Sequence, residues 1–151
     1  MKKFVFRFDT VLRVKEKKEE ALKRELMHLT ALRLEQEKIR KAVSRSSAEN
    51  LRMKNEEKQK GTDIGRLIYY EQHLSVLRYR IVEAEKKIQE LHKMADRKRE
   101  EVVEASKEKK IFEKLRDRDY KIFNKNILAA EQKQLDETSI SKYNRKEQHN
   151  F

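Results

Sequence analysis

Apolar side chains recur at alternating intervals of three and four residues through the second half of the chain. The series runs from Leu67 to Phe112 and includes two lysines. Its positions are Leu67, Tyr70, Leu74, Leu77, Ile81, Ala84, Ile88, Leu91, Ala95, Lys98, Val102, Ala105, Lys109 and Phe112. A repeat that averages 3.5 residues keeps one stripe of a helix turned towards a partner helix. The pattern predicts a long α-helix within a coiled coil.

The first half carries a rougher apolar stripe. Its members are Phe8, Val11, Leu12, Leu22, Leu26, Leu29, Leu32, Ile39, Val43 and Met53. Gln36, Ser46, Ser47 and Asn50 interrupt it. Polar insertions in such a seam fix the register at some cost in stability. An alternative is that the polar cluster from Ser44 to Ser47 and the residues up to Asn50 form a pliable stretch.

Both glycines fall between the two stripes. Gly61 suits a left-handed helix C-cap, and Thr62 or Asp63 can cap the start of the next helix. We therefore expect one coiled-coil module with a helix at about 8–60, a turn at about 61–65, a second helix at about 64–141 and a flexible tail at about 142–151. A short turn favours antiparallel neighbours. The predicted fold is all-α, a long antiparallel two-helix coiled-coil hairpin.

The second helix is expected to overhang the first. Counting back from the turn places Phe8 opposite about Lys114 to Arg118, where the regular stripe also changes phase. Beyond that point five apolar residues would lie on a single helix: Ile122, Phe123, Ile127, Leu128 and Leu135. They predict either a docking face for another protein or a contact with a folded-back N-terminus, whose apolar residues are Phe4, Val5, Phe6 and Phe8.

Composition supports helices over a globular core. Charged residues make up 44% of the chain and hydrophobic residues 36%, and there is no proline. Globular domains usually have about 45–50% apolar and about 25% charged residues. The net charge is +12, and residues 1–60 hold 18 basic and 10 acidic residues. This charge predicts attraction to an anionic partner, whether nucleic acid, lipid or an acidic protein.

The sequence offers no chemistry for catalysis. It has no cysteine, and its four histidines, His28, His73, His92 and His149, are isolated from one another. We expect no enzyme activity, no cofactor and no metal site. No segment has the roughly 20 apolar residues of a membrane span, and the N-terminal apolar run is too short for a signal peptide. A surface helix at the N-terminus is possible, but a hydrophobic plug is preferred, and cytoplasmic residence is expected.

Three stretches resemble the bacterial flagellar FliJ family. The opening Lys3-Phe4-Val5-Phe6-Arg7-Phe8-Asp9-Thr10-Val11-Leu12 is similar to the start of these proteins. The turn followed by Leu67-Ile68-Tyr69-Tyr70-Glu71-Gln72 resembles the start of their second helix. The late runs from Glu108 to Arg118 and from Glu131 to Glu137 resemble their C-terminal region. The stretches occur in the family's order, and the resemblance extends over nearly the whole chain.

The resemblance implies a flagellar type III protein export component. Proteins of this family are stalk-like coiled coils that bind the export ATPase hexamer, promote its activity and couple it to the cytoplasmic domain of the membrane export gate. They are also described as escorting export chaperones. The implied location is the cytoplasm, peripherally at the cytoplasmic face of the inner membrane at the flagellar base, with no stable membrane insertion.

The resemblance also implies two sets of contact residues. The set expected at the ATPase is Leu12, Arg13, Glu131, Gln132, Leu135 and Asp136. The set expected at the export gate is Tyr70, His73, Leu77, Arg80 and Ala84. An alternative for Tyr70, Leu77 and Ala84 is that they are residues of the helix–helix seam.

Two other functions remain open at this point. The chain could be a basic coiled coil that binds nucleic acid or another anionic scaffold, or a structural spacer. Its basic runs, Lys15 to Glu20 and Arg97 to Glu101, are broken by glutamates. A DNA-reading basic helix needs an uninterrupted block of Lys and Arg, so nucleic acid is not the expected partner.

Overall fold

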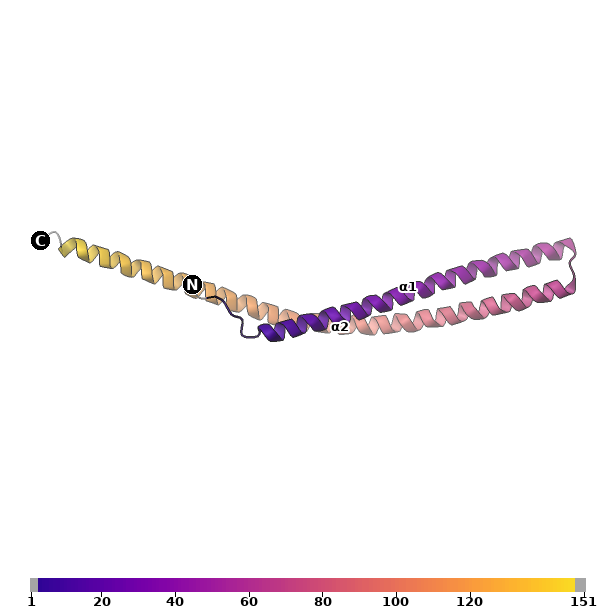
Figure 1. The fold of residues 1–151 in the computed structure, drawn as a ribbon, viewed down its shortest axis with the longest axis horizontal. Helices are drawn as coiled ribbons and strands as arrows, with labels where there is room; N and C mark the ends of the chain where they lie inside the picture. The colour runs from indigo at the N-terminus through magenta and orange to yellow at the C-terminus, as the bar shows by residue number, and fades with distance from the viewer. Residues whose placement is uncertain (1–2, 149–151) are drawn as a thin grey trace. The chain divides into compact units, whose positions relative to one another are not determined.

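The computed structural model describes residues 3–148, which form two α-helices joined by a short turn (Figure 1). Helix α1 spans Asp9–Lys60 and helix α2 spans Ile64–Gln148. The helices pack against each other in antiparallel order, which confirms the predicted all-α hairpin. Helix α2 passes the predicted end near residue 141, so that boundary was wrong. Residues 149–151, the last of the predicted tail, lie outside the described residues.

The chain divides into two compact units, and each is described by itself. One unit comprises residues 20–104, which include the turn. The other comprises the N-terminal residues to Glu19 together with α2 from Ala105 onwards.

The turn has the predicted backbone chemistry at Gly61. Its φ is +78°, in the left-handed region that costs a residue with a Cβ about 1–2 kcal/mol. The backbone N–H of Leu67 donates to the carbonyl of Asp63 at 3.4 Å, which puts Asp63 at the N-cap of α2. The Thr62 hydroxyl instead donates to Glu57 Oε2 at 3.4 Å, closing the turn back onto α1.

The seam on α2 follows the predicted stripe. Every stripe residue from Leu67 to Phe112 is buried or half-buried. Leu74, Ala95 and Ala105 are only 1–2% exposed. Lysines at two stripe positions are held by carboxylates: Lys98 Nζ lies 2.8 Å from Glu25 Oε2, and Lys109 Nζ lies 2.6 Å from the buried Glu19. The 3.5-residue repeat is therefore the contact surface of the hairpin.

The seam on α1 departs from the predicted stripe after Leu29. Leu32, Ile39 and Met53, which were predicted to belong to the stripe, are 41–42% exposed. The half-buried positions continue the regular steps of three and four instead: Arg33, Gln36, Arg40, Val43, Ser47, Asn50, Lys54 and Glu57. Val11 is likewise exposed, at 38%, whereas Leu12 is buried.

The continuous stripe of α2 explains this change. It presents an apolar residue at nearly every step, so the facing helix must keep the same 3.5-residue period whatever its sequence. Arg33, Arg40 and Lys54 can cover that stripe with their aliphatic stems while their charged ends reach the edge. Arg40 Nη1 lies 3.6 Å from Glu85 Oε1, and Lys54 pairs with Glu71. The predicted interruptions are thus seam positions, except Ser46, which is exposed.

Asn50 shows how the polar seam is satisfied locally. Its side-chain nitrogen donates to the carbonyl of Ser46 at 2.8 Å, within α1 itself. A polar seam residue that bonds to its own helix avoids an unsatisfied donor. Because this bond lies within α1, it does not set the register between the two helices.

The N-terminal segment folds back and packs on α2. This was one of two alternatives predicted for the apolar residues beyond the seam, the other being a docking face for another protein. The Phe4 ring lies 5.3 Å from Tyr120 and 5.5 Å from Phe123, measured between ring centroids. Phe6 is 6% exposed, and Phe8 lies 6.1 Å from Phe112, slightly before the predicted Lys114 to Arg118. Val5 does not join this cluster, being 83% exposed. The fold-back covers α2 only as far as about Phe123.

From Leu128 onwards, no segment within residues 3–148 covers α2, as expected from the predicted overhang. Every residue from Leu128 to Tyr143 is exposed, including Leu128 at 65% and Leu135 at 63%. Side-chain bonds here stay within the helix: Gln132 Nε2 donates to Asp136 Oδ1 at 3.0 Å. This part of α2 is a single helix that presents apolar and charged groups together.

We predict that Leu74→Ala lowers the free energy of unfolding by about 2–5 kcal/mol, because it removes buried apolar volume from the seam. Thermal and urea unfolding followed by circular dichroism measures the change. Met94→Ala, at a position 50% exposed, is the control and should change stability by less than about 0.5 kcal/mol. Equal losses in both variants would contradict the assigned seam.

We also predict that stability falls at both ends of the pH scale. Hydrogen bonds from Lys54 and Lys15 hold the pKa values of Glu71 and Glu108 below their usual 4.5. Their contribution is present above pH 4.5 and is lost as the pH falls through the lower folded-state pKa values. Hydrogen bonds to Glu101 and Glu25, and to Glu19, raise the pKa values of Lys98 and Lys109 above 10.5. That contribution is lost as the pH rises through these raised values.

Melting temperatures across the pH range test this expectation. Glu108→Gln should flatten the acid limb, because Gln cannot lose a charge as the pH falls. Glu90→Gln is the control, since Glu90 is exposed and has no ion-pair partner among the described residues. An acid limb unchanged by Glu108→Gln would show that this pair contributes nothing to the acid dependence.

Candidate partner-binding surfaces

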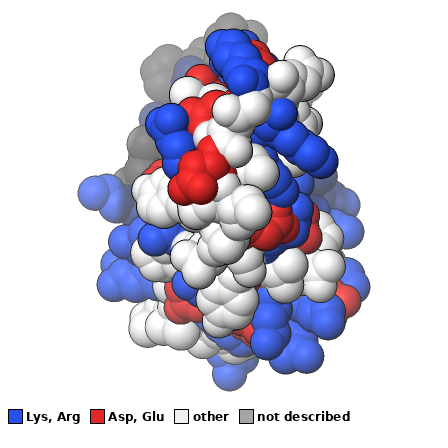
Figure 2. Space-filling view, turned by 90° about the vertical axis from the view of Figure 1, so that its right-hand side faces the viewer, with Lys and Arg blue, Asp and Glu red and all other residues white. Residues whose placement is uncertain are grey.

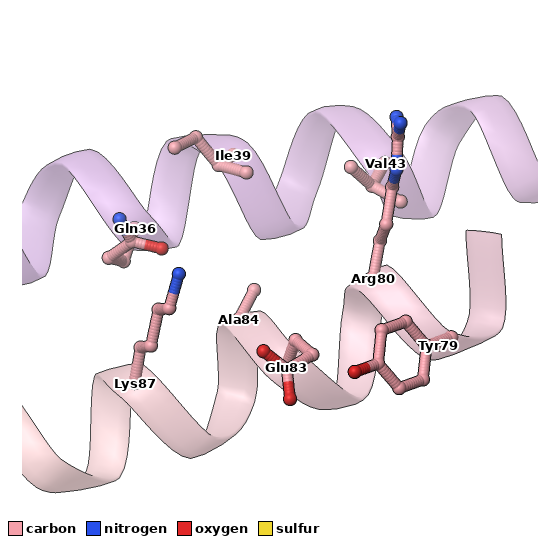
Figure 3. Close-up of a pocket in the computed structure, with 8 residues that line it drawn as sticks. All are labelled: Gln36, Ile39, Val43, Tyr79, Arg80, Glu83, Ala84 and Lys87. Atoms are coloured by element: carbon pink, nitrogen blue, oxygen red, sulfur yellow. The ribbon is translucent and has the colours of Figure 1, made fainter. Parts of the chain in front are cut away.

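A shallow groove runs between the two helices on one edge of the unit that contains the turn. It has a volume of about 390 Å³. Its lining residues are Gln36, Ile39 and Val43 of α1 and Tyr79, Arg80, Glu83, Ala84 and Lys87 of α2 (Figure 3). Ile39, Val43 and Ala84 supply apolar surface, and Arg80 and Lys87 extend from α2 towards α1. The groove thus combines apolar and basic groups.

The basic side of this groove belongs to a longer row. Arg66, His73, Arg80 and Lys87 follow one another at seven-residue intervals, which places them on one edge of α2. Arg66 lies 3.4 Å from Glu57 Oε1, whereas Arg80 and Lys87 have no ion-pair partner within residues 3–148. Two unneutralised cations beside an apolar surface favour a partner with acidic and apolar groups.

The residues implied for export-gate binding divide between this edge and the seam. Leu77 and Ala84 are 5% and 4% exposed, so they pack between the helices. Tyr70 is half-buried and its hydroxyl donates to Glu57 Oε1 at 3.3 Å. Burial, with the nearby Glu57 carboxylate, raises the pKa of Tyr70. The accessible members are His73, whose ring stacks on Tyr69, and Arg80.

The residues implied for ATPase binding are mostly accessible. Glu131, Gln132, Leu135 and Asp136 all lie on the uncovered part of α2. Arg13 is exposed and pairs with Asp9 at 2.7 Å. Leu12 is the exception, because it is 2% exposed and fills the seam. A buried residue of this kind supports the fold of that end rather than contacting a partner directly.

A further surface was missed from the sequence. On the side of α2 opposite the seam, five large apolar residues are 51–67% exposed: Ile68, Tyr69, Val76, Tyr79 and Val82. A partial signal was present, since Ile68, Tyr79 and Val82 fall on a series with steps of four and three, although positions 72 and 75 of that series are Gln and Ser. It was overlooked because the stronger stripe that begins at Leu67 already accounts for the hairpin.

Basic side chains outnumber acidic ones on the face shown in Figure 2. Among the described residues, no cluster of three or more His, Cys, Asp or Glu side chains could hold a metal ion. None of the described helices is sufficiently apolar over a sufficient length to cross a membrane. The fold is that of a helical-hairpin protein with exposed apolar and charged surfaces along and beyond the seam.

Comparison with known proteins gives the family. The family described as "Flagellar FliJ protein" matches residues 3–148. The flagellar FliJ protein of Bacillus subtilis (strain 168) is 29% identical over 142 residues, which cover 93% of this chain and 95% of that relative. No solved structure gives a significant match. The chain belongs to the FliJ family and is a component related to flagellar protein export.

Proposed function

We propose that this protein is a non-enzymatic, stalk-like component of the flagellar type III export apparatus. It binds the export ATPase hexamer, promotes its activity, couples it to the cytoplasmic domain of the export gate and escorts export chaperones. It acts in the cytoplasm, peripherally at the inner membrane at the flagellar base. Family membership supports the setting.

The uncovered end of α2 carries the ATPase part of the proposal. A single α-helix is about 10–12 Å across, narrow enough to enter a channel in a ring of subunits. The exposed side chains from Leu128 to Tyr143 have no covering segment in the described part of the chain. Leu135 and its charged neighbours supply the apolar and polar contacts that an interface needs.

The groove on the turn-containing unit carries the gate part. Its apolar floor, with Arg80 and Lys87, which have no ion-pair partner in the described part of the chain, is suited to an acidic, apolar segment of a partner. Since Leu77 and Ala84 are buried, their role there is to hold the two helices and so position the accessible groups.

For the ATPase, we expect the protein to raise the hydrolysis rate of the cognate export ATPase. Leu135→Asp should raise the concentration needed for half-maximal stimulation about tenfold, equal to about 1.4 kcal/mol. Met27→Asp is the matched control, because Met27 is 70% exposed on α1, and it should stimulate normally. Steady-state phosphate release measures both variants.

Two results would contradict this part of the proposal. One is stimulation that Leu135→Asp leaves unchanged, or that Met27→Asp weakens equally. The other is strong salt-dependent binding to duplex DNA with no effect on the ATPase, which would favour a nucleic-acid-binding protein.

For the gate, Arg80→Glu should weaken binding to the isolated cytoplasmic gate domain about tenfold, because it reverses a charge on the groove. Titration calorimetry with the full chain measures the affinity. Arg97→Glu makes the same charge change at an exposed site outside the groove and should bind normally. Equal weakening by both variants would indicate long-range electrostatics and not a contact in the groove.

A further inference from the structure

The outward side of α2 next to the turn is free of charge over about four helical turns. This outer stripe consists of Ile68, Tyr69, Val76, Tyr79 and Val82 with Gln72 and Ser75 between them. Its five large apolar residues are 51–67% exposed, in a chain of which 44% is charged. Further along the same side most positions are charged: the same steps lead to Lys86, Gln89, Lys93, Asp96 and Glu100. Apolar surface concentrated in this way marks an interaction site.

Most of the charged residues beside the outer stripe are arranged in pairs about its midpoint. An acidic residue on one side of the midpoint matches a basic residue at the same distance on the other side. The midpoint of the stripe lies between Leu74 and Ser75. Glu71 and Arg78 are equally far from this midpoint, and so are Arg66 and Glu83. Every pair of charged residues related in this way between Asp63 and Lys86 joins an acid to a base. A second α2 laid antiparallel on the first, with a two-fold axis at the midpoint, would therefore meet complementary charges on both edges.

In the same antiparallel arrangement, Arg80, Glu83 and Arg78 of one copy each face a favourable partner on the other copy. Arg80, which has no ion-pair partner among residues 3–148, would face Tyr69 of the other copy, a cation–π partner. Glu83 also lacks an ion-pair partner there and would gain Arg66. Arg78 lies 3.5 Å from Glu71 within its own chain and would exchange this contact for Glu71 of the other copy.

We propose that the outer stripe binds a second copy of this chain, antiparallel and related by a two-fold axis near Ser75. The contact is isologous, so it closes as a dimer and does not propagate. Because it extends over only about 21 Å of helix, it is smaller than a standard interface, and the dimer forms in the micromolar range. It uses none of the residues proposed to bind the ATPase, so its test is independent of any ATPase measurement.

Sedimentation velocity of the full chain, from low to high micromolar concentration, measures the association. The expected result is a concentration-dependent monomer–dimer equilibrium. Tyr79→Lys should weaken it at least tenfold, because it places a charge in the centre of the stripe. Val103→Lys is the control on an exposed α2 residue beyond the stripe and should associate like the unaltered chain.

Charge reversal tests the antiparallel register. Glu71→Arg and Arg78→Glu should each weaken self-association, because each variant places like charges opposite one another. An equimolar mixture of the two should restore the dimer, since every 71–78 pair then again joins an acid to a base. Circular dichroism of each variant confirms that the helices are intact.

Cysteine crosslinking gives a second measurement of the same geometry. The chain has no cysteine, so a single Ser75→Cys reports only contacts between copies. Oxidation should crosslink Ser75→Cys and leave Ser44→Cys, on α1, as monomer. A chain that stays monomeric throughout, a mixture that fails to restore the dimer, or equal crosslinking of both cysteine variants would overturn the proposal.

Discussion

The hairpin depends on one interaction, the burial of the 3.5-residue stripe of α2 against α1. Isolated helices rich in charge are marginal in water, because side-chain pairs along a helix contribute only tenths of a kcal/mol. The ion pairs at the edges of the seam are mostly exposed, and pairs of that kind typically add less than about 1 kcal/mol each. Burial of the stripe, at about 25 cal/mol per Å² of apolar surface, stabilises the hairpin more than these ion pairs do. The positions of α1 that face α2 follow the same 3.5-residue repeat, even where the apolar residues of α1 do not fall on those positions.

This asymmetry links the stability of the hairpin to its surfaces. Next to the turn, α1 contributes Arg, Gln, Ser, Asn and Lys to the seam, while Ile39 and Met53 lie outside it. Apolar side chains that are not used between the helices are available at the edges. The groove with Ile39 on its wall and the outer stripe of α2 both occur in this part of the chain. The polar seam of α1 and the exposure of Ile39 and Met53 are two consequences of the same sequence pattern.

The other unit ends its seam in a different way. Phe4 packs on Tyr120 and Phe123, Phe8 packs on Phe112, and the buried Phe6 contacts Phe8, so aromatic rings finish the apolar contact. Nearby, Glu19 and Lys109 form the one close ion pair with a nearly buried carboxylate among the pairs described. A buried pair of this kind penalises shifts of register, because a slip would leave a charge without its partner. From Leu128 to Tyr143, the side chains of α2 are exposed to solvent.

The sequence alone determined the two helices, the turn at Gly61, the seam of α2, the overhang and the family, because each depends on local pattern or on residue order. It did not determine which side of α1 faces the seam. That was decided by the partner helix, whose continuous stripe imposes its period on Arg33, Gln36 and Arg40 and turns Leu32 and Ile39 outwards. The same packing removed Leu12, Leu77 and Ala84 from the accessible surface and exposed Tyr79 and Val82 instead. Burial is a property of two surfaces in contact, so only the tertiary structure could show which apolar residues hold the hairpin together and which remain free to bind.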